Sequence, residues 1–406
     1  MSEGTGSGEE NAAVANPDTT PGTPRLLRSI NDRSALELLL EHGPLTRTRI
    51  GALTGLSKPT ASQLVDRLLT ADLIVPAGTA AGGPGPSAQL YAVNPAAGHA
   101  GGVDVTHTRV TAAISDLTGE VIGEFEVAVV GRTAAGSVER VRDALHGAAE
   151  TAGLNPDAVR HVVIGVPGAP HPETGQLGFA RDLPGWHGGN LARLRELLGV
   201  RVEVENDVNL AAIAEQHLGQ ARGSENFVVL WLGNGIGLAI VQDGRFVRGA
   251  TGGAGEIGYM PVALDPADPL AHTAKPVKNT FQNIAGRPAV LQLAREHGIR
   301  VEDHSEAVRR AVETGNEAML TTLAGRAARG LAPVLAVLDP SLVVLSGGTL
   351  RAGGDLLKDL ITHELHAVAV PRPTLAVSTV EGNPVLAGAI HAALRTVRED
   401  LFNRGV

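Results

Sequence analysis

The chain has 406 residues, enough for two or three domains, and 43% of them are hydrophobic, enough to bury a core. It has no cysteine, which excludes disulfide bonds and thiolate metal sites, and no apolar run approaches the roughly 18–20 residues of a membrane helix. The net charge of −9 argues against coating of nucleic acid by the whole chain, although it is compatible with one small DNA-binding domain. Because the N-terminus also lacks a charged-then-apolar leader pattern, we expect a cytoplasmic protein with no membrane partner.

Three helices are expected after an N-terminal tail. Residues 1–24 are mainly Gly, Ser, Thr, Pro and acidic residues, a composition that predicts disorder. The pattern then predicts helices over 34–41, from a Thr46 cap to Thr54, and over 58–70. Apolar residues of the third helix recur at i, i+3, i+4 and i+7 and should face the other helices, namely Ala61, Leu64, Val65 and Leu68.

This arrangement predicts a helix-turn-helix whose third helix enters the major groove of DNA. Two strands around a Gly/Pro loop follow, so residues 25–95 are predicted to be a winged helix-turn-helix domain. Three-helix modules also serve as dimerisation or docking units, but seven cations against five acids over residues 25–75 favour DNA. The candidate DNA-binding residues, with Gln63 suited to an adenine edge, are Arg47, Ser57, Lys58, Thr60, Gln63 and Arg67.

A polar dipeptide marks the centre of the remaining chain. Residues 200–204 alternate like a strand, and Asn206-Asp207 follows at its carboxyl end, just before a helical run. Parallel α/β sheets place ligand groups at such positions. Asp207 suits a general base or an acceptor for hydroxyls, and the Asn206 amide suits a polyol. The alternative is that either residue only caps the helix, and the dipeptide by itself favours the cap.

Two glycine-rich clusters follow. The first, Gly233-Asn234-Gly235, lies between two predicted strands, where glycines let backbone N–H groups approach a phosphate. Such a hairpin is equally common without a ligand. The second, residues 252–255, brings Glu256 to a bend, where a lone Glu is usually a solvated loop residue.

The order and spacing of four motifs resemble the ROK family of sugar kinases and sugar-responsive repressors. They are Leu183-Pro184-Gly185-Trp186, Glu205-Asn206-Asp207, Gly233-Asn234-Gly235-Ile236-Gly237 and Ala254-Gly255-Glu256-Ile257-Gly258. The resemblance covers nearly the whole chain after residue 24, and the N-terminal module looks like the winged helix-turn-helix of the family's repressors. It implies an α/β fold for residues 96–406, a two-lobed actin-like ATPase (ribonuclease H-like) domain. The lobe boundary is expected near residue 218, with the C-terminal helix 384–397 returning to the first lobe.

The resemblance also implies a sugar site. Tyr259 and Gln282 stand where the family usually has His and Glu, so the effector is expected to differ from glucose or the pocket to be silent. The implied sugar-binding residues are Asn206, Asp207, Glu256, Tyr259, Gln282 and Gly168. The family's zinc site uses that His and three cysteines, so we expect no zinc and no other metal here.

The implied nucleotide site is altered. The family's first phosphate loop, Asp-x-Gly-x-Thr-Lys, here has Thr106 for the glycine and Arg109 for the lysine, which weighs against ATP binding. The residues that the resemblance assigns to the nucleotide, the last two as a Gly-Gly adenosine loop, are Asp104, Thr108, Gly233, Asn234, Gly235, Gly347 and Gly348.

The favoured hypothesis is a DNA-binding transcriptional regulator of the repressor type. It would bind operator DNA and a sugar or sugar derivative, use no cofactor, and form a homodimer or tetramer in which lobe closure changes the spacing of paired DNA-binding modules. The alternative is an ATP-dependent sugar kinase that uses Mg-ATP, with Asp207 as catalytic base and the N-terminal module as an accessory. A regulator without a ligand is kept open by Tyr259 and Gln282.

Overall fold

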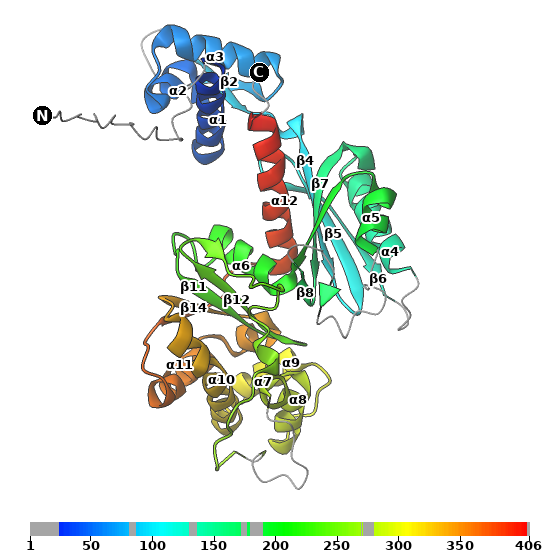
Figure 1. The fold of residues 1–406 in the computed structure, drawn as a ribbon, viewed down its shortest axis with the longest axis vertical. Coiled ribbons are helices and arrows are strands. Elements are labelled where there is room, and N and C mark those ends of the chain that lie inside the picture. Colours follow the sequence, from blue (N-terminus) through cyan, green and yellow to red (C-terminus); the bar gives the residue numbers. More distant parts are fainter. Residues whose placement is uncertain are drawn as a thin grey trace, which may run out of the picture. The chain divides into compact units, whose positions relative to one another are not determined.

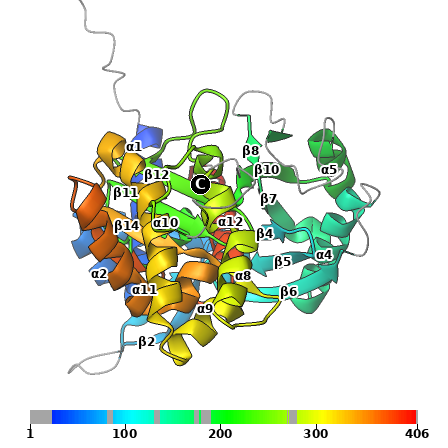
Figure 2. The ribbon, with the colours of Figure 1, turned by 90° about the horizontal axis from the view of Figure 1, so that it is seen from below.

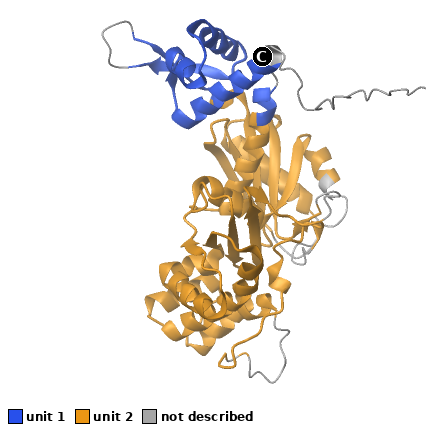
Figure 3. Cartoon of the chain, turned by 60° about the vertical axis from the view of Figure 1, so that its left-hand side comes forward, with its two compact units in different colours: residues 1–94, 399–406 blue, residues 95–398 orange. Residues whose placement is uncertain are grey.

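The computed structural model describes residues 24–80, 87–129, 136–171, 177–178, 190–268, 270 and 280–403. The chain divides into two compact units: unit 1 comprises Met1–Asn94 with Glu399–Val406, and unit 2 comprises Pro95–Arg398 (Figure 3). The predicted tail, apart from Pro24, lies outside the described residues, as does the Leu183-Pro184-Gly185-Trp186 motif.

Unit 1 is a three-helix module with a small antiparallel sheet in the order β1-β3-β2 (Figure 1). Its elements are α1 (Pro24–His42), β1 (Leu45–Thr46), α2 (Arg47–Thr54), α3 (Lys58–Thr70), β2 (Ile74–Thr79) and β3 (Gln89–Val93). The predicted caps of α2 are present: the Thr46 side chain accepts a hydrogen bond from the Arg49 backbone N–H, and Gly55 ends the helix at φ 70°. The predicted apolar stripe of α3 is buried, which confirms the helix-turn-helix arrangement.

The first helix is longer than its sequence pattern predicts. It begins at Pro24 rather than near Ser34. Leu26, Leu27 and Ile30 in its first half are 50–55% exposed, so this half has no buried periodic face that a pattern could reveal. β1 was not predicted either, because two residues form a strand here only by pairing with β3, Leu45 opposite Tyr91.

The first lobe of unit 2 is built on a five-stranded sheet in the order β10-β7-β4-β5-β6. The strands are β4 (His99–Val105), β5 (Arg109–Ser115), β6 (Val121–Ala128), β7 (Val159–Val166) and β10 (Arg201–Asn206), of which β4, β7 and β10 run parallel. Successive residues of a strand point to opposite faces. Gly101 lies against Leu145 of α4 (Ser137–Thr151) and Gly102 against Ile390 of α12 (Pro384–Asn403), so helices cover both faces of β4.

The second lobe repeats this topology. Its sheet has the order β13-β12-β11-β14-β15, with β11 (Phe227–Leu232), β12 (Ile236–Gln242), β13 (Arg245–Phe246), β14 (Leu342–Ser346) and β15 (Thr374–Val377). In both lobes a three-stranded antiparallel meander is extended by two parallel strands beside its first strand. A tight turn joins β12 to β13, with positive φ at Asp243 and Gly244. The structure therefore confirms the predicted two-lobed α/β fold.

Helix α6 (Asp207–Leu218) follows β10 along the chain and precedes β11, and the second lobe contains most of the remaining helices. They are α7 (Phe281–Ala285), α8 (Arg287–Glu296), α9 (His304–Glu313), α10 (Glu317–Leu338) and α11 (Gly347–Val368), while α5 (Asn190–Leu198) belongs to the first lobe. Helices α10 and α11 lie side by side and share the largest apolar cluster with β11 and β14 (Figure 2). Short elements complete the fold: η1 (Pro95–Ala97), η2 (Pro156–Ala158), β8 (Ala169–Pro170), β9 (Leu177–Gly178) and η3 (Ile257–Tyr259).

One prediction needs correction. The Gly347-Gly348 pair, expected as a loop, begins α11, which is interrupted at Gly354 by φ 56° and ψ −151°. None of the described helices is both long and apolar enough to cross a membrane.

Candidate functional site

The outward face of α3 carries the candidate DNA-reading side chains. Lys58, Thr60 and Gln63 are exposed, while the opposite stripe is buried. Ser57 precedes the helix, and its hydroxyl lies 2.8 Å from the Thr60 hydroxyl. This face therefore offers an amide, a cation and two hydroxyls, the groups that contact base edges and phosphates.

Two predicted DNA-binding arginines are engaged within unit 1 instead. Arg67 pairs with the buried Asp32, NH2 to Oδ1 at 2.5 Å. Arg47 donates to Asp66 at 2.7 Å and to the Tyr91 hydroxyl at 3.0 Å. Both guanidinium groups thus hold the module together, and Arg67 is not part of the exposed face with which it was predicted.

Three carboxylates gather where the first lobe's sheet meets the glycine-rich segment of the second lobe. Asp104 ends β4, Asp207 opens α6 beside β10, and Glu256 precedes η3. Burial raises the pKa of Asp207 to about 7, and the negative charges of Asp104 and Glu256 act in the same direction. The structure therefore brings together three residues that lie far apart in the sequence, within electrostatic reach of one another.

The other two carboxyls of this cluster are also perturbed. Burial raises the pKa of Asp104, although Asn383 Nδ2 donates a hydrogen bond of 2.7 Å to Asp104 Oδ2 that acts in the opposite direction. Burial likewise raises the pKa of Glu256. Several carboxyl groups with raised pKa values in one place are typical of a binding or catalytic site.

Asn206 is the N-cap of α6, which was the alternative that the dipeptide favoured. Its Oδ1 accepts from the Asn209 backbone N–H at 3.0 Å, and its Nδ2 donates to the Gly168 carbonyl at 2.9 Å. The amide is therefore used at both ends to join α6 to the loop after β7. One N–H and one lone pair of the side chain are left by these two bonds.

Two residues of this region were missed by sequence reasoning. Arg248, in the segment after β13, donates to the Glu205 carboxylate through Nε at 2.9 Å and NH2 at 2.6 Å. Asn383 caps α12 through its Oδ1 and donates to Asp104. Glu205 had been noted only as part of a motif, and neither partner carries a local signal.

The glycine hairpin between β11 and β12 is held by hydrogen bonds within itself and from Gln282 and Arg287. The Gly233 N–H donates to the Gly235 carbonyl at 3.0 Å. Gln282 accepts from the Ile236 N–H at 2.9 Å and donates to the Asn234 carbonyl at 3.3 Å, while Arg287 donates to Asn234 Oδ1 at 3.4 Å. The structure thus has the amide of Gln282, a candidate sugar-binding residue, bonded to the hairpin backbone.

The first phosphate loop is closed by a side chain. The Thr106 hydroxyl donates to the Arg109 carbonyl at 2.9 Å and accepts from the backbone N–H groups of Arg109 and Thr108 at 3.1 and 3.4 Å. The Arg109 side chain lies 3.5 Å from Glu126. The amides that would face a phosphate are therefore occupied within the loop itself, and the cation is paired with Glu126 of β6.

The Gly347-Gly348 pair is explained by packing. Gly347 has φ 81°, and a Cβ there would lie 2.4 Å from the Leu232 carbonyl oxygen. A Cβ on Gly348 would lie 2.2 Å from Ser305 Oγ at the start of α9. Gly347 therefore requires glycine whether or not a nucleotide binds, whereas a side chain at Gly348 would displace the Ser305 hydroxyl.

Residues 265–268, which follow η3, are anchored to α10 by two ion pairs. Asp268 receives two hydrogen bonds from the buried Arg326 of α10, at 2.8 and 2.9 Å, and Asp265 pairs with Arg329 of the same helix. Tyr259, in place of a histidine, is 45% exposed. Among the described residues, no group of three or more His, Asp or Glu could hold a metal ion.

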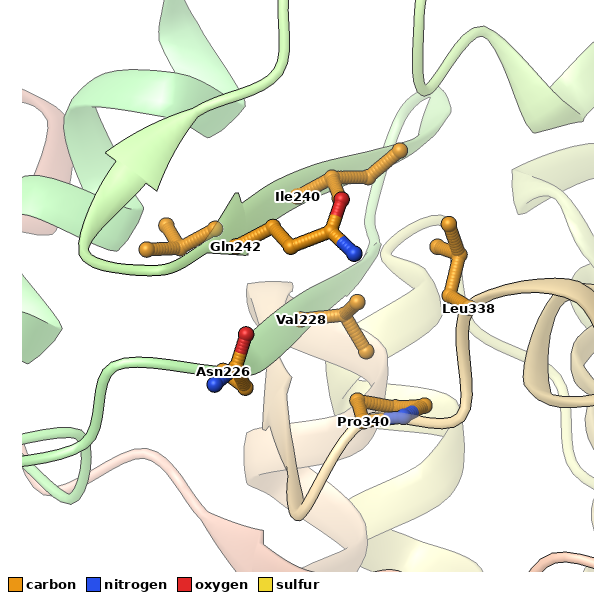
Figure 4. A pocket seen from close by; sticks show the side chains of 7 residues that line it. Asn226, Val228, Ile240, Gln242, Leu338 and Pro340 are labelled. Atoms are coloured by element: carbon orange, nitrogen blue, oxygen red, sulfur yellow. The ribbon is translucent and has the colours of Figure 1, made fainter.

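A small pocket elsewhere in the second lobe does not belong to this site. Its volume of about 10 Å³ corresponds to a single water molecule (Figure 4). It lies at the start of β11, whereas the glycine hairpin follows the end of that strand. The labelled lining residues are Asn226, Val228, Ile240, Gln242, Leu338 and Pro340.

Comparisons with known proteins agree with both units. The sequence profile of the ROK family matches residues 100–391, and that of the MarR family matches residues 29–83. A putative xylose repressor of Caldicellulosiruptor sp. (strain Rt8B.4) is 26% identical over 86% of this chain and 90% of its own length. A glucokinase of Halalkalibacterium halodurans is 26% identical over 67% of this chain and 86% of its own length.

A solved structure has the same arrangement of elements along nearly the whole chain. It is a ROK family transcriptional regulator, a homologue of the E. coli MLC protein, with a TM-score of 0.72, 18% identity, and coverage of 93% of this chain and 100% of that one. At this identity the likeness concerns the fold alone.

Proposed function

Because the chain belongs to the ROK family, we propose that it is a transcriptional repressor whose α3 reads operator DNA and whose carboxylate cluster binds a neutral sugar as effector. The observation that carries the proposal is the closed first phosphate loop beside an intact carboxylate cluster. Thr106 occupies the loop amides, while Asp207 and Glu256 remain together. A sugar site without a receptive phosphate loop fits a sensor better than a kinase.

The chemistry of the cluster favours a neutral polyol. Ionised carboxylates only accept hydrogen bonds, and sugar hydroxyls donate them. Asp104, Asp207 and Glu256 together would repel a sugar phosphate or sugar acid, and Arg248 is already paired with Glu205. Since relatives are named xylose repressors, pentoses are the first sugars to test.

The exposed face of α3 supports the DNA-binding half of the proposal. Gln63 can form a bidentate contact with adenine, and Lys58 can neutralise a phosphate. In a two-fold dimer, paired α3 helices would meet half-sites about 34–36 Å apart, one helical turn of DNA. A homodimer or tetramer is part of the proposal, and neither zinc nor another cofactor is needed for it.

A sugar kinase is the second candidate, because one observation favours it. A carboxyl with a pKa of about 7 matches what a general base for a hydroxyl requires, and Asp207 has that value. Under this alternative Mg-ATP is the second substrate, and the Thr106 hydroxyl has to leave the loop amides before a phosphate can approach.

The test is isothermal titration with pentoses, hexoses, N-acetylhexosamines and sugar phosphates, each with and without Mg-ATP. We expect heat from a neutral sugar without ATP, lost in Asp207→Asn and kept in Asp157→Asn, an exposed acid of the first lobe. ATP hydrolysis that depends on the sugar would contradict the repressor hypothesis and support the kinase alternative. Binding confined to sugar phosphates would contradict the neutral effector.

The DNA-binding half is tested by selection of duplexes from a random library. The recovered sequences should contain two related half-sites, and Gln63→Ala should relax the preference at one base pair of each. Failure of the protein to enrich any sequence would remove operator binding from the proposal.

A further inference from the structure

We propose that the Glu205–Arg248 ion pair is a latch between the two lobes that positions Glu256 against Asp207, so that effector affinity depends on two residues that do not themselves bind the effector. The inference rests on the proposed sugar site. Glu205 ends β10 of the first lobe, and Arg248 follows β13 of the second. The pair therefore joins the two segments that supply the candidate sugar-binding carboxylates.

The first-lobe partner is held in place. Oε1 of Glu205 accepts from the Asn206 N–H and from Asn209 Nδ2, both at 2.9 Å. Oε2 accepts from two nitrogens of Arg248. The Glu205 side chain is 15% exposed, so both of its oxygens are paired in a largely buried setting at the start of α6. Its position is thereby fixed relative to Asp207, two residues further on.

The second-lobe partner belongs to a segment that reaches across to the first lobe. We call residues 247–256 the Arg248 segment. The Arg248 carbonyl accepts from the Ala254 N–H at 3.2 Å, which closes the segment into a loop. A Cβ on Gly252 would lie 2.3 Å from the Pro170 carbonyl oxygen, so this glycine touches β8 of the first lobe.

The far end of the Arg248 segment is fixed to the second lobe. The Leu238 N–H donates to the Gly255 carbonyl at 2.9 Å, and a Cβ on Gly255, at φ 92°, would lie 1.9 Å from the Leu238 carbonyl oxygen. Glu256 follows directly. The segment is thus held at Arg248 and Gly252 on one lobe and at Gly255 on the other.

A restraint is needed because the two carboxylates repel each other when both are ionised. The charge of Glu256 acts on Asp207, and two ionised carboxylates in a partly buried site move apart unless other bonds hold them. The ion pair opposes this separation without adding a free cation to the site. Loss of the pair should let the Arg248 segment move and widen the distance between the two acceptors.

A purely stabilising ion pair would behave differently. The Arg248 side chain is 43% exposed, and after its replacement Glu205 keeps its hydrogen bonds from the Asn206 N–H and Asn209 Nδ2, so the pair contributes little to global stability. Arg248→Gln and Glu205→Gln should therefore change Tm by no more than about 3 °C. Both should raise the effector Kd on the order of tenfold, and the double variant should be no weaker than either single one, because both remove the same interaction.

The experiment combines titration with hydrogen exchange. The wild type, Arg248→Gln, Glu205→Gln, the double variant and Arg248→Lys are titrated with pentoses, and amide exchange of Leu238 and of residues 247–258 is measured without ligand. Arg248→Lys, which keeps the charge, should recover part of the affinity. Arg245→Ala, an exposed cation of the same hairpin, is the matched control and should bind like the wild type.

Faster exchange at Leu238 and Ala254 in Arg248→Gln, together with the weaker binding, is the expected result. Wild-type affinity and wild-type exchange in Arg248→Gln would overturn the latch, as would an equal loss in Arg245→Ala. If the wild type binds no sugar, the proposed effector site fails, and the exchange measurement still decides whether the pair fixes the Arg248 segment.

Discussion

Asp207 carries a carboxyl whose pKa is raised to about 7 by burial and by the neighbouring charges of Asp104 and Glu256. In the unfolded chain the same carboxyl titrates near pH 4, so between about pH 4 and 7 the folded protein binds more protons than the unfolded chain. Stability from this group therefore falls as the pH rises through that window and is constant above it. We expect Asp207→Asn to be more stable than the wild type at pH 8, by about 1–2 kcal/mol after allowance for partial exposure.

The measurement is urea unfolding of both proteins at pH 5 and pH 8. The difference between them should shrink toward the lower pH, where the wild-type carboxyl is also neutral. An unchanged difference at the two values would contradict a raised pKa at this residue.

Gln63 and Arg67 lie on the same helix, but their replacement should affect different properties, namely operator affinity for Gln63 and stability for Arg67. Gln63 is exposed, so Gln63→Ala should leave stability unchanged and weaken operator binding by about 1–3 kcal/mol. Arg67 pairs with Asp32, which is 3% exposed, so Arg67→Ala leaves a buried carboxylate without its partner. We expect a loss of about 3 kcal/mol in unfolding free energy.

Thermal unfolding and fluorescence anisotropy with operator DNA separate the two effects. Arg67→Ala at a temperature where it is fully folded should bind DNA nearly as the wild type does. If Arg67→Ala is as stable as the wild type but no longer binds DNA, then Arg67 contacts DNA directly.

The sequence predicts side chains whose place depends on helix periodicity, and it misses those whose place depends on a distant partner. The buried stripe of α3 and the exposure of Lys58 and Gln63 follow from the spacing of four apolar residues. The pairing of Arg67 with Asp32 joins residues 35 positions apart. No local pattern distinguishes an arginine that pairs internally from one that meets a phosphate.

At the scale of elements, the segment of residues 261–268 depends on α10. Arg326 is 2% exposed and donates to both oxygens of Asp268, and one more N–H donates to the Ile284 carbonyl. Arg326→Met keeps an unbranched side chain and removes the charge, leaving Asp268 with the hydrogen bond from the Leu270 N–H but without the arginine that faces both of its oxygens. We expect a loss of about 3–5 kcal/mol in unfolding free energy, because a buried carboxylate that has lost its cation is costly.

Calorimetry with and without EDTA supplies the measurement and its control. We propose that the segment needs no zinc, so EDTA should not shift Tm of the wild type, whereas Arg326→Met should lower it. A clear fall of Tm with EDTA would show that a metal contributes after all.

Glycine-rich clusters could be located from the sequence, but their purpose could not. The sequence allows the glycines around Asn234 to be interpreted as a phosphate loop or as a hairpin without a ligand, and those before Glu256 as a bend. In the structure, Gly255 and Gly347 lie against the carbonyls of Leu238 and Leu232, and the first helix turn of α11 starts at the second of these contacts. A backbone packed against another backbone requires glycine for the same steric reason as a bound phosphate does, so sequence cannot separate the two.

At the scale of the molecule, the order of the motifs resembles that of one family and so implies two α/β lobes, and the structure has two five-stranded sheets with the same topology. The grouping of Asp104, Asp207 and Glu256 also follows from that fold. The Glu205–Arg248 pair could not be predicted, since it depends on how a loop of one lobe meets a strand of the other. The fold can therefore be predicted from sequence motifs, whereas the interactions between its lobes cannot.

The two ligands of the proposed repressor share no residue, because the candidate DNA contacts belong to unit 1 and the candidate sugar contacts to unit 2. Any effect of one on the other is then a coupling free energy, which must be the same in both directions. An effector that binds only the DNA-free form should weaken operator binding about 100-fold when present at 100 times its Kd. Saturating operator should raise the Kd of the sugar by the full coupling factor.

Anisotropy titrations of labelled operator with increasing sugar give one side of this cycle, and calorimetry of the sugar with and without operator gives the other, both at one salt concentration. Asp207→Asn is the control: it should bind operator as the wild type does and ignore the sugar. A sugar that binds tightly but leaves operator affinity unchanged has equal affinity for the free and the DNA-bound protein. In that case unit 2 would bind a sugar without affecting operator binding. The kinase alternative, with Asp207 as general base, would then be favoured.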